Sequence, residues 1–165
     1  MKEVLNHLIE SLREELKVYG EMLALLDQQQ HMVMHRQTQD LFECVAAINA
    51  QAETVAATRR EREQRQRHVA RQVGLPEDAA FAEIVPHLPA DYRPLILALV
   101  QNNNESLIRV RQRARHNHLL LNRIVELMQR FIGALFPGAH GSTYTDDGAL
   151  AGAALPQRSL YDAVG

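Results

Sequence analysis

The residues with the clearest potential for chemistry are a histidine pair and a single cysteine. His31 and His35 lie four residues apart, a spacing that places two side chains on one helical face and that can bind a metal. No cysteine or acidic motif elsewhere supplies a third ligand, so we interpret both histidines as solvent-facing. Cys44 lies in an apolar segment without an adjacent base and reads as a small packed residue. We therefore predict no enzyme activity, no metal and no cofactor.

Two runs of arginine raise the hypothesis of nucleic-acid binding. The first run contains Arg59, Arg60, Arg62, Arg65, Arg67 and Arg71, and the second contains Arg109, Arg111, Arg113 and Arg115. Glu61 and Glu63 interrupt the first run, no aromatic residues are interleaved, and the chain has a net charge of −2. We expect a solvated helical surface with local ion pairs, and no nucleic-acid partner.

The composition is typical of a helical bundle in a reducing compartment. The 165 residues are 46% hydrophobic but only 5% aromatic, with no tryptophan. One cysteine cannot form an internal disulfide. No secretory signal is visible, and the longest apolar run, residues 95–100, is far shorter than the ~20 residues of a membrane span. We expect a soluble, cytoplasmic protein without membrane insertion.

The chain is organised around residues 94–136, which predict one helix of ~60 Å at ~1.5 Å per residue. Its apolar residues recur at alternating steps of three and four. They are Val100, Leu107, Val110, Ala114, Leu121, Ile124, Met128, Phe131 and Leu135. Asn103 and Asn117 occupy the same seam and are interpreted as polar residues that set the register. A heptad pattern of this kind indicates a partner helix alongside.

Two further long helices precede it. Residues 2–35 carry one heptad seam whose steps of three and four residues continue without interruption. The seam comprises Leu5, Ile9, Leu12, Leu16, Tyr19, Leu23, Leu26, Gln30 and Val33. Asp40 and Glu43 resemble a capping box that begins the second helix, and Gly74 ends it, followed by Pro76. The seam of this second helix is polar in its later half, where it passes through Arg59, Arg62 and Gln66.

Shorter elements complete the chain. Residues 76–85 predict a short amphipathic helix, and Asp91 is expected to cap the long helix that follows. Residues 138–165 lack periodicity and predict a mobile tail with spaced apolar anchors. The anchors are Tyr144, Leu155, Leu160, Tyr161 and Val164. We expect one bundle domain over residues 1–137 and a flexible tail over residues 138–165.

The end of the last helix is apolar on more than one face. The residues concerned are Leu119, Leu120, Leu121, Ile124, Val125, Leu127, Met128, Phe131, Ile132, Leu135 and Phe136. One partner helix cannot cover so many apolar side chains, so the sequence predicts a hydrophobic docking surface just before the tail.

The order of these features resembles the FlgN family of flagellar type III export chaperones, over nearly the whole chain. The matching features are the helix opened by Asp40, the arginine-rich stretch ending at Gly74-Leu75, the short proline-bounded helix, the long helix containing Leu119-Leu120-Leu121-Asn122, and the tail sequences at residues 143–148 and 160–162.

The resemblance implies a function. Members hold the hook–filament junction proteins FlgK and FlgL in the cytoplasm before export and bind an amphipathic C-terminal segment of this cargo on their last helix. A tail tyrosine is implicated in docking at the export gate component FlhA. Carried over to this chain, Tyr144 would make the gate contact. The cargo surface would comprise Leu121, Ile124, Met128, Phe131 and Leu135.

We therefore expect an all-α protein, an elongated antiparallel bundle of three long helices plus one short helix, acting as an export chaperone. Without cargo, the same surface can pair with another copy of the chain. Two alternatives remain at this point: a coiled-coil scaffold or adaptor that self-associates through its heptad helices, and a helical nucleic-acid-binding protein.

Overall fold

The structure is a computed structural model that describes residues 1–35 and 38–135. Its elements are α1 (Lys2–Met34), α2 (Thr38–Gln72), α3 (Phe81–Ile84), the 3₁₀ helix η1 (Val85–His87) and α4 (Arg93–Leu135). Every regular element in the described ranges is helical, which confirms the predicted all-α class. The predicted tail lies outside the described residues.

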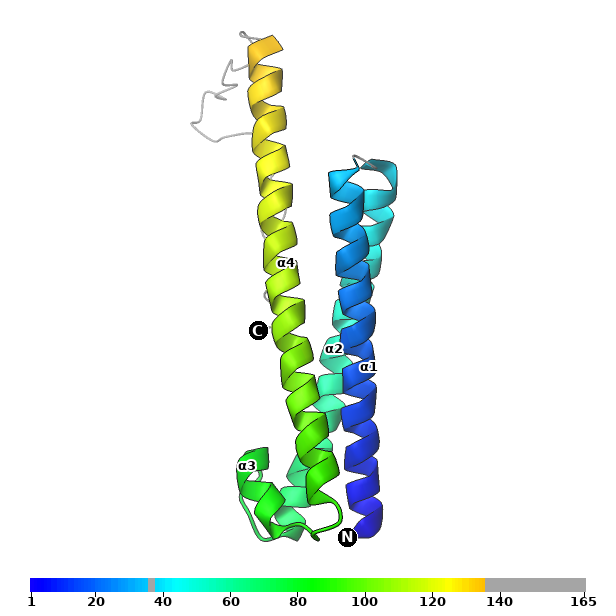
Figure 1. The fold of residues 1–165 in the computed structure, drawn as a ribbon, viewed down its shortest axis with the longest axis vertical. Helices are drawn as coiled ribbons and strands as arrows, with labels where there is room; N and C mark the ends of the chain where they lie inside the picture. Colours follow the sequence, from blue (N-terminus) through cyan, green and yellow to red (C-terminus); the bar gives the residue numbers. More distant parts are fainter. Residues whose placement is uncertain (36–37, 136–165) are drawn as a thin grey trace, which may run out of the picture.

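The long helices run up, down and up again (Figure 1). α2 returns alongside α1, α3 and η1 lie at the base, and α4 rises parallel to α1 and extends beyond it. α1 packs extensively against both α2 and α4, whereas α2 and α4 make little contact with each other. The predicted bundle of three long helices and one short helix is confirmed, with α1 as its central member.

The central position of α1 explains why its core is wider than the single predicted seam. Leu5, Ile9, Leu12, Tyr19 and Leu26 are buried as expected. A second row, not predicted as a seam, is buried beside them: Leu8, Ser11, Glu15, Val18, Met22 and Gln29. A helix between two neighbours must bury two faces, and the sequence of α1 supplies both.

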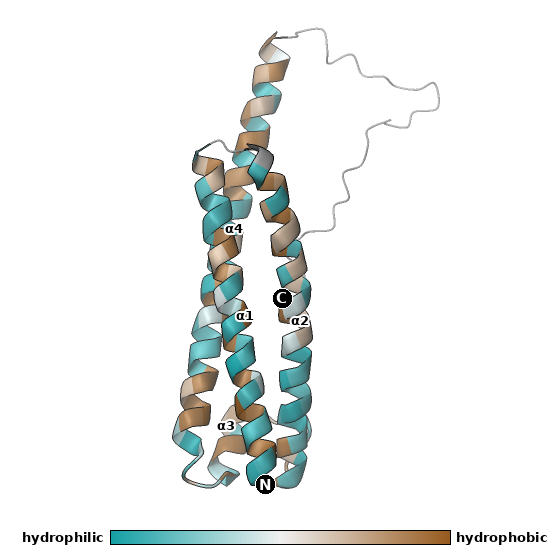
Figure 2. Cartoon of the chain, turned by 90° about the vertical axis from the view of Figure 1, so that its right-hand side faces the viewer, coloured by the Kyte–Doolittle hydropathy of each residue, from teal (hydrophilic) through white to brown (hydrophobic). Residues whose placement is uncertain are grey.

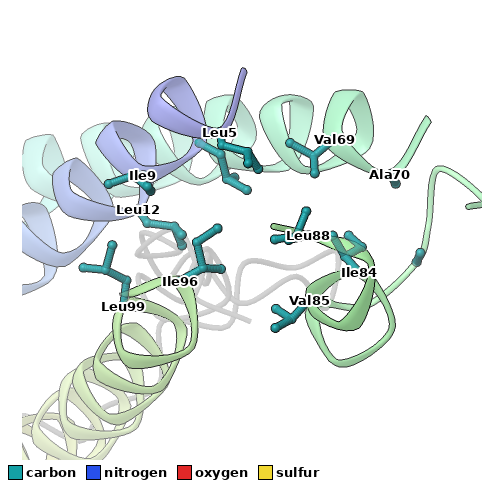
Figure 3. Close-up of a cluster of buried hydrophobic side chains, with 12 residues drawn as sticks. Leu5, Ile9, Leu12, Val69, Ala70, Ile84, Val85, Leu88, Ile96 and Leu99 are labelled. Carbon is teal, nitrogen blue, oxygen red and sulfur yellow. The ribbon is translucent and has the colours of Figure 1, made fainter. Parts of the chain in front are cut away.

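Two hydrophobic clusters form the core. The lower one gathers residues of all the helices at the base of the bundle (Figure 3). Its buried members are Leu5, Leu8, Ile9, Leu12, Val69, Ala70, Ala79, Ile84, Val85, Leu88, Ile96 and Leu99. The upper cluster involves only the three long helices and comprises Val18, Tyr19, Met22, Leu26, Cys44, Ile48, Val55, Val110 and Ala114. The base is therefore closed by the short helices, while the upper half has no fourth element among residues 1–35 and 38–135.

The ends of α2 agree only partly with the sequence. The helix begins at Thr38, so Asp40 lies inside its first turn and the predicted capping box at Asp40 is wrong. The predicted stop at Gly74 is correct: its φ of 76° lets the chain reverse. Leu75 N–H donates to the Ala70 carbonyl at 2.9 Å and Gly74 N–H to that of Arg71 at 3.2 Å, the hydrogen bonds of a Schellman motif.

The short helical region is more compact than predicted. Residues 76–80 are not helical and include a turn at residues 77–78, and only Phe81–Ile84 and Val85–His87 are helical, so the prediction of a helix from residue 76 was wrong. The Glu83 carboxylate accepts a 2.8 Å hydrogen bond from the Ala80 N–H, and this contact fixes the first turn. Tyr92, rather than Asp91, precedes α4, because its carbonyl accepts from the Ile96 N–H at 3.1 Å.

Candidate functional site

Two buried asparagines set the alignment of α4 on α1. Asn103 Nδ2 donates to the Leu12 carbonyl at 2.9 Å, and Asn117 Nδ2 donates to the Leu26 carbonyl at 2.7 Å. Both bonds join residues 91 positions apart. This constant offset sets Met34, the last residue of α1, level with Val125. We define residues 125–135, which continue α4 past the end of α1, as the overhang (Figure 1).

Most of the predicted cargo surface lies on or next to the overhang. Met128, Phe131 and Leu135 expose 60%, 65% and 57% of their area. Ile124 exposes 37%, and Leu121 is half-buried because α1 still runs beside α4 at that level. The structure therefore places the five residues along one end of α4, where the three beyond Ile124 are each more than half exposed.

Three other large apolar residues of the overhang are equally exposed and were not included in the predicted site. Val125, Leu127 and Ile132 expose between 50% and 57%. Figure 2 shows hydrophobic colouring on the part of α4 that rises above the α1–α2 hairpin. Their apolar character was visible in the sequence, but the site was chosen from a single heptad seam, which omits them.

An apolar surface of this size has a physical meaning. Large contiguous exposed apolar patches are rare on monomeric soluble proteins and often mark sites of protein interaction. The charged residues of the overhang region, Arg123, Glu126 and Arg130, are exposed as well. The overhang is thus an amphipathic helix whose apolar face has no neighbour among the described residues, the arrangement used when a partner helix docks alongside.

A second feature of the structure is a charged pair inside the bundle. Glu15 of α1 is 3% exposed, and its Oε2 accepts a 3.0 Å bond from Arg62 Nε of α2. Tyr19 donates its hydroxyl to the other Glu15 oxygen at 3.0 Å. Burial, reinforced by the Glu15 carboxylate, raises the pKa of the Tyr19 hydroxyl well above its ordinary value. This pair lies where the predicted seam of the second helix becomes polar.

The Glu15–Arg62 pair borders a cleft of about 380 Å³ between the long helices and α3. Arg62 makes two further contacts within the protein: Nη1 donates to Gln66 at 2.8 Å, and the guanidinium lies 5.9 Å from the Phe81 ring centroid. Gln66 in turn donates to the Ala79 carbonyl at 2.8 Å. The network ties α1, α2 and the base together.

The other arginines of the first run behave as the sequence predicts. Arg59 pairs with Glu63 at 3.1 Å, and Arg65 pairs with Glu61 at 3.4 Å, each one helical turn apart. In the second run, Arg113 bridges to Asp27 of α1 at 2.8 Å and so joins two helices. These are local and interhelical ion pairs at partly exposed positions.

The histidines and the cysteine have structural contacts. His31 and His35 stack with ring centroids 3.9 Å apart, and no cluster of three or more metal-ligating side chains occurs in residues 1–35 and 38–135. Cys44 is 5% exposed and its Sγ lies 3.6 Å from the Leu25 carbonyl. Burial raises the pKa of this thiol, which disfavours the reactive thiolate.

Comparison with known proteins decides the identity. The model of the family described as FlgN protein matches residues 1–152. The chain belongs to the FlgN family. No curated protein and no solved structure matches the chain. None of the helices in the described part of the chain is long and apolar enough to cross a membrane.

Membership of the FlgN family makes the chain a chaperone of flagellar assembly, with hook-associated proteins as its cargo. The match confirms the resemblance drawn from the order of helices and motifs. It covers the whole of α4 and the overhang. In this FlgN-family fold, the overhang is the largest group of exposed apolar side chains on one described element.

Proposed function

We propose that this chain holds hook-associated proteins of the FlgK and FlgL type in the cytoplasm and covers their C-terminal helical region until export. The contact surface is the end of α4, comprising Leu121, Ile124, Met128, Phe131 and Leu135. The observation that carries the proposal is the overhang, an apolar helix end that projects beyond the helix packed against its lower part. An amphipathic cargo helix laid along it would cover apolar surface on both partners.

The energy available from these five residues indicates how large the contact must be. Full burial of one such side chain contributes ~1.5–3 kcal/mol, and each is already partly covered. Completing the burial of all five would contribute on the order of 5 kcal/mol. Association itself costs ~4–15 kcal/mol in lost freedom. A stable complex therefore needs more of the overhang than the single predicted seam.

The proposal can be tested by co-expressing the chain with each hook-associated protein of the same organism, followed by size-exclusion chromatography. The double variant Met128→Ala, Phe131→Ala should lose the complex, because truncation at an interface centre weakens binding by ~10-fold or more per residue. Its thermal unfolding should be unchanged, since both side chains are more than half exposed in the free protein.

Leu119→Ala is the matched control. Leu119 is 60% exposed on the same helix but lies on the opposite side from the overhang's apolar face. We expect it to leave the complex intact. If instead the double variant binds normally and only melts at a lower temperature, these residues are core and the proposed surface is wrong. Self-association without any cargo complex would favour a coiled-coil scaffold.

We also propose that Tyr144 contacts the export gate component FlhA and so delivers the cargo. Tyr144 lies outside the described residues, and the support is its place in the family pattern together with the value of tyrosine as an interface anchor. A contact on a segment separate from the cargo surface would raise the local concentration of cargo at the gate.

Tyr144→Ala should leave cargo affinity unchanged and block secretion of the cargo, measured in vitro and in cells respectively. Tyr161→Ala, a second tyrosine of the same segment, is the control and should secrete normally. Normal secretion by Tyr144→Ala would remove the gate role from this residue, and loss of cargo affinity would reassign it to the cargo surface.

When cargo is absent, we propose that two copies of the chain pair through their overhangs. Light scattering across a range of concentrations should then show a dimer that dissociates when cargo is added. The Met128→Ala, Phe131→Ala variant should stay monomeric at every concentration.

A further inference from the structure

The bundle itself shows how much of a helix one neighbour buries. Between residues 103 and 117, α4 packs mainly on α1, and its buried residues there are Asn103, Val110, Ala114 and Asn117. At about 100° per residue, these four lie within an arc of roughly 60° around the helix axis. One neighbouring helix therefore buries a narrow strip of α4.

α1 shows the result for a helix with two neighbours. It lies between α2 and α4, and its buried residues run from Val18 at one edge to Ile9 at the other. On the same angular scale, they cover an arc of roughly 180°. Within this protein, a second neighbour thus about triples the buried arc.

The apolar arc of the overhang is nearly as wide as the buried arc of α1, the helix with two neighbours. It extends from Leu127 at one edge to Val125 at the other, roughly 160° on the same scale. Two stripes make up this arc. The first stripe, defined as Val125, Met128, Ile132 and Leu135, continues the strip that α1 covers lower on α4. The second stripe, defined as Leu127 and Phe131 with Ile124 directly before the overhang, is rotated from it by roughly 90°.

All the residues of both stripes are exposed in the free chain. Those of the first stripe expose between 50% and 60%, and those of the second between 37% and 65%. Each stripe has the alternating three- and four-residue steps that pack one helix. A single docked helix would bury a narrow strip, as α1 does on α4, and would leave part of this wider arc in water.

We propose that the overhang binds two helices of one cargo chain, packed side by side. This inference rests on the proposed chaperone function and specifies the form of its cargo. The first cargo helix lies on the first stripe, where it continues the α1–α4 interface and meets the end of α1 at Met34, which is 68% exposed. The second lies on the second stripe and packs against the first. Cargo-bound α4 then has two neighbours at its tip, as α1 has along its length.

The test uses the hook-associated protein that forms the complex described above, both at full length and as a peptide of its C-terminal helix alone. Ile132→Ser disrupts the first stripe and Leu127→Ser the second, while Leu119→Ser is the control on the opposite side. Affinity is measured by titration calorimetry and stoichiometry by light scattering. All three side chains are at least half exposed, so thermal unfolding should be unaffected.

We expect a complex of one chaperone with one cargo, in which Ile132→Ser and Leu127→Ser each weaken full-length cargo about tenfold or more and Leu119→Ser has no effect. The single-helix peptide should bind more weakly than full-length cargo and should respond to only one of the two stripe variants. Full affinity of the peptide, sensitivity of full-length cargo to one stripe alone, or two chaperones per cargo would each overturn the inference while leaving the chaperone function intact. Absence of any complex with hook-associated proteins would defeat the proposed function instead.

Discussion

Asn117 donates its side-chain amide to the main-chain carbonyl of Leu26 at 2.7 Å, and this bond repeats, two heptads away, the one between Asn103 and Leu12. A slide of α4 along α1 would break both bonds at once. The Oδ1 atoms of both asparagines are buried and have no hydrogen-bond partner. Each asparagine thus lowers stability through its unsatisfied acceptor. Together the two residues favour one register of α4 on α1, and this register places the overhang beyond α1.

The double variant Asn103→Leu, Asn117→Leu should unfold at the same or a higher denaturant concentration. Leucine removes both the buried acceptors and the need to satisfy them, and its side chain has the same number and branching of heavy atoms as asparagine. The cost should appear as a loss of register, because an apolar seam can pair at several offsets. Disulfide trapping between cysteines introduced on α1 and α4 would measure this. A single trapped register in the double variant would contradict the register role.

The buried pair Glu15–Arg62 gives a second prediction. Arg62 is 15% exposed, so Glu15→Ala would leave its guanidinium largely buried, with only the longer 3.8 Å contact from Nη2 to Glu63. We expect the free energy of unfolding to fall by ~3 kcal/mol, within the range for breaking a buried pair. Arg59→Ala is the control: its side chain and that of Glu63 are both more than a third exposed, so the loss should be ~1 kcal/mol or less.

Replacing both members, as in Glu15→Leu with Arg62→Leu, should restore much of the stability lost in Glu15→Ala, because no buried charge remains. Urea titration of the three variants would measure the coupling. A double variant as unstable as Glu15→Ala would show that the network of Arg62 with Gln66, rather than the ion pair, stabilises this layer.

The heptad pattern predicts some features of this fold and cannot predict others. The period predicted three long helices and the register role of Asn103 and Asn117, because it depends only on spacing along one chain. It could not show that α1 has two neighbours, since its second row contains polar residues such as Ser11 and Glu15 that read as solvated. The pairing of Glu15 with Arg62 joins residues 47 positions apart and has no local signal.

The candidate site on α4 was also only partly predictable from the sequence. The apolar end of α4 was visible in the sequence, but where α1 stops covering it depends on the alignment of two helices. Only the 91-residue offset shows that Leu121 is half-buried while Met128 is exposed. The predicted capping box at Asp40 was wrong because α2 begins two residues earlier. Asp40 therefore lies within the helix instead of flanking its first turn.

Two glycines allow a paired test of the helix assignments. Gly20 lies inside α1, and a Cβ added there would meet no atom within 4 Å. Gly20→Ala should therefore raise the free energy of unfolding by ~0.5–1 kcal/mol. Gly74 has a φ of +76°, so Gly74→Ala should lower it, by ~1 kcal/mol. Thermal melting of both variants gives the signs, and stabilisation by Gly74→Ala would be inconsistent with the Schellman motif.

The last prediction concerns alkaline pH. Burial and the Glu15 carboxylate raise the pKa of Tyr19 above its usual value of 10.0. Above pH 10, the unfolded chain therefore releases the tyrosine proton while the folded chain retains it. The unfolded state binds fewer protons, so the free energy of unfolding falls as pH rises, by up to ~1.4 kcal/mol per pH unit from this group.

Cys44 contributes in the same direction from about pH 9, because burial raises the pKa of its thiol above 9.0. Urea unfolding between pH 8 and 11 should show a steepening loss of stability. Cys44→Ala should remove the part that begins near pH 9, and Tyr19→Phe the part above pH 10. The contribution of Tyr19 rests first on its burial and then on its contact with Glu15, 3.0 Å away inside the bundle. A Tyr19→Phe profile parallel to that of the unmodified chain across this range would place the hydroxyl in water.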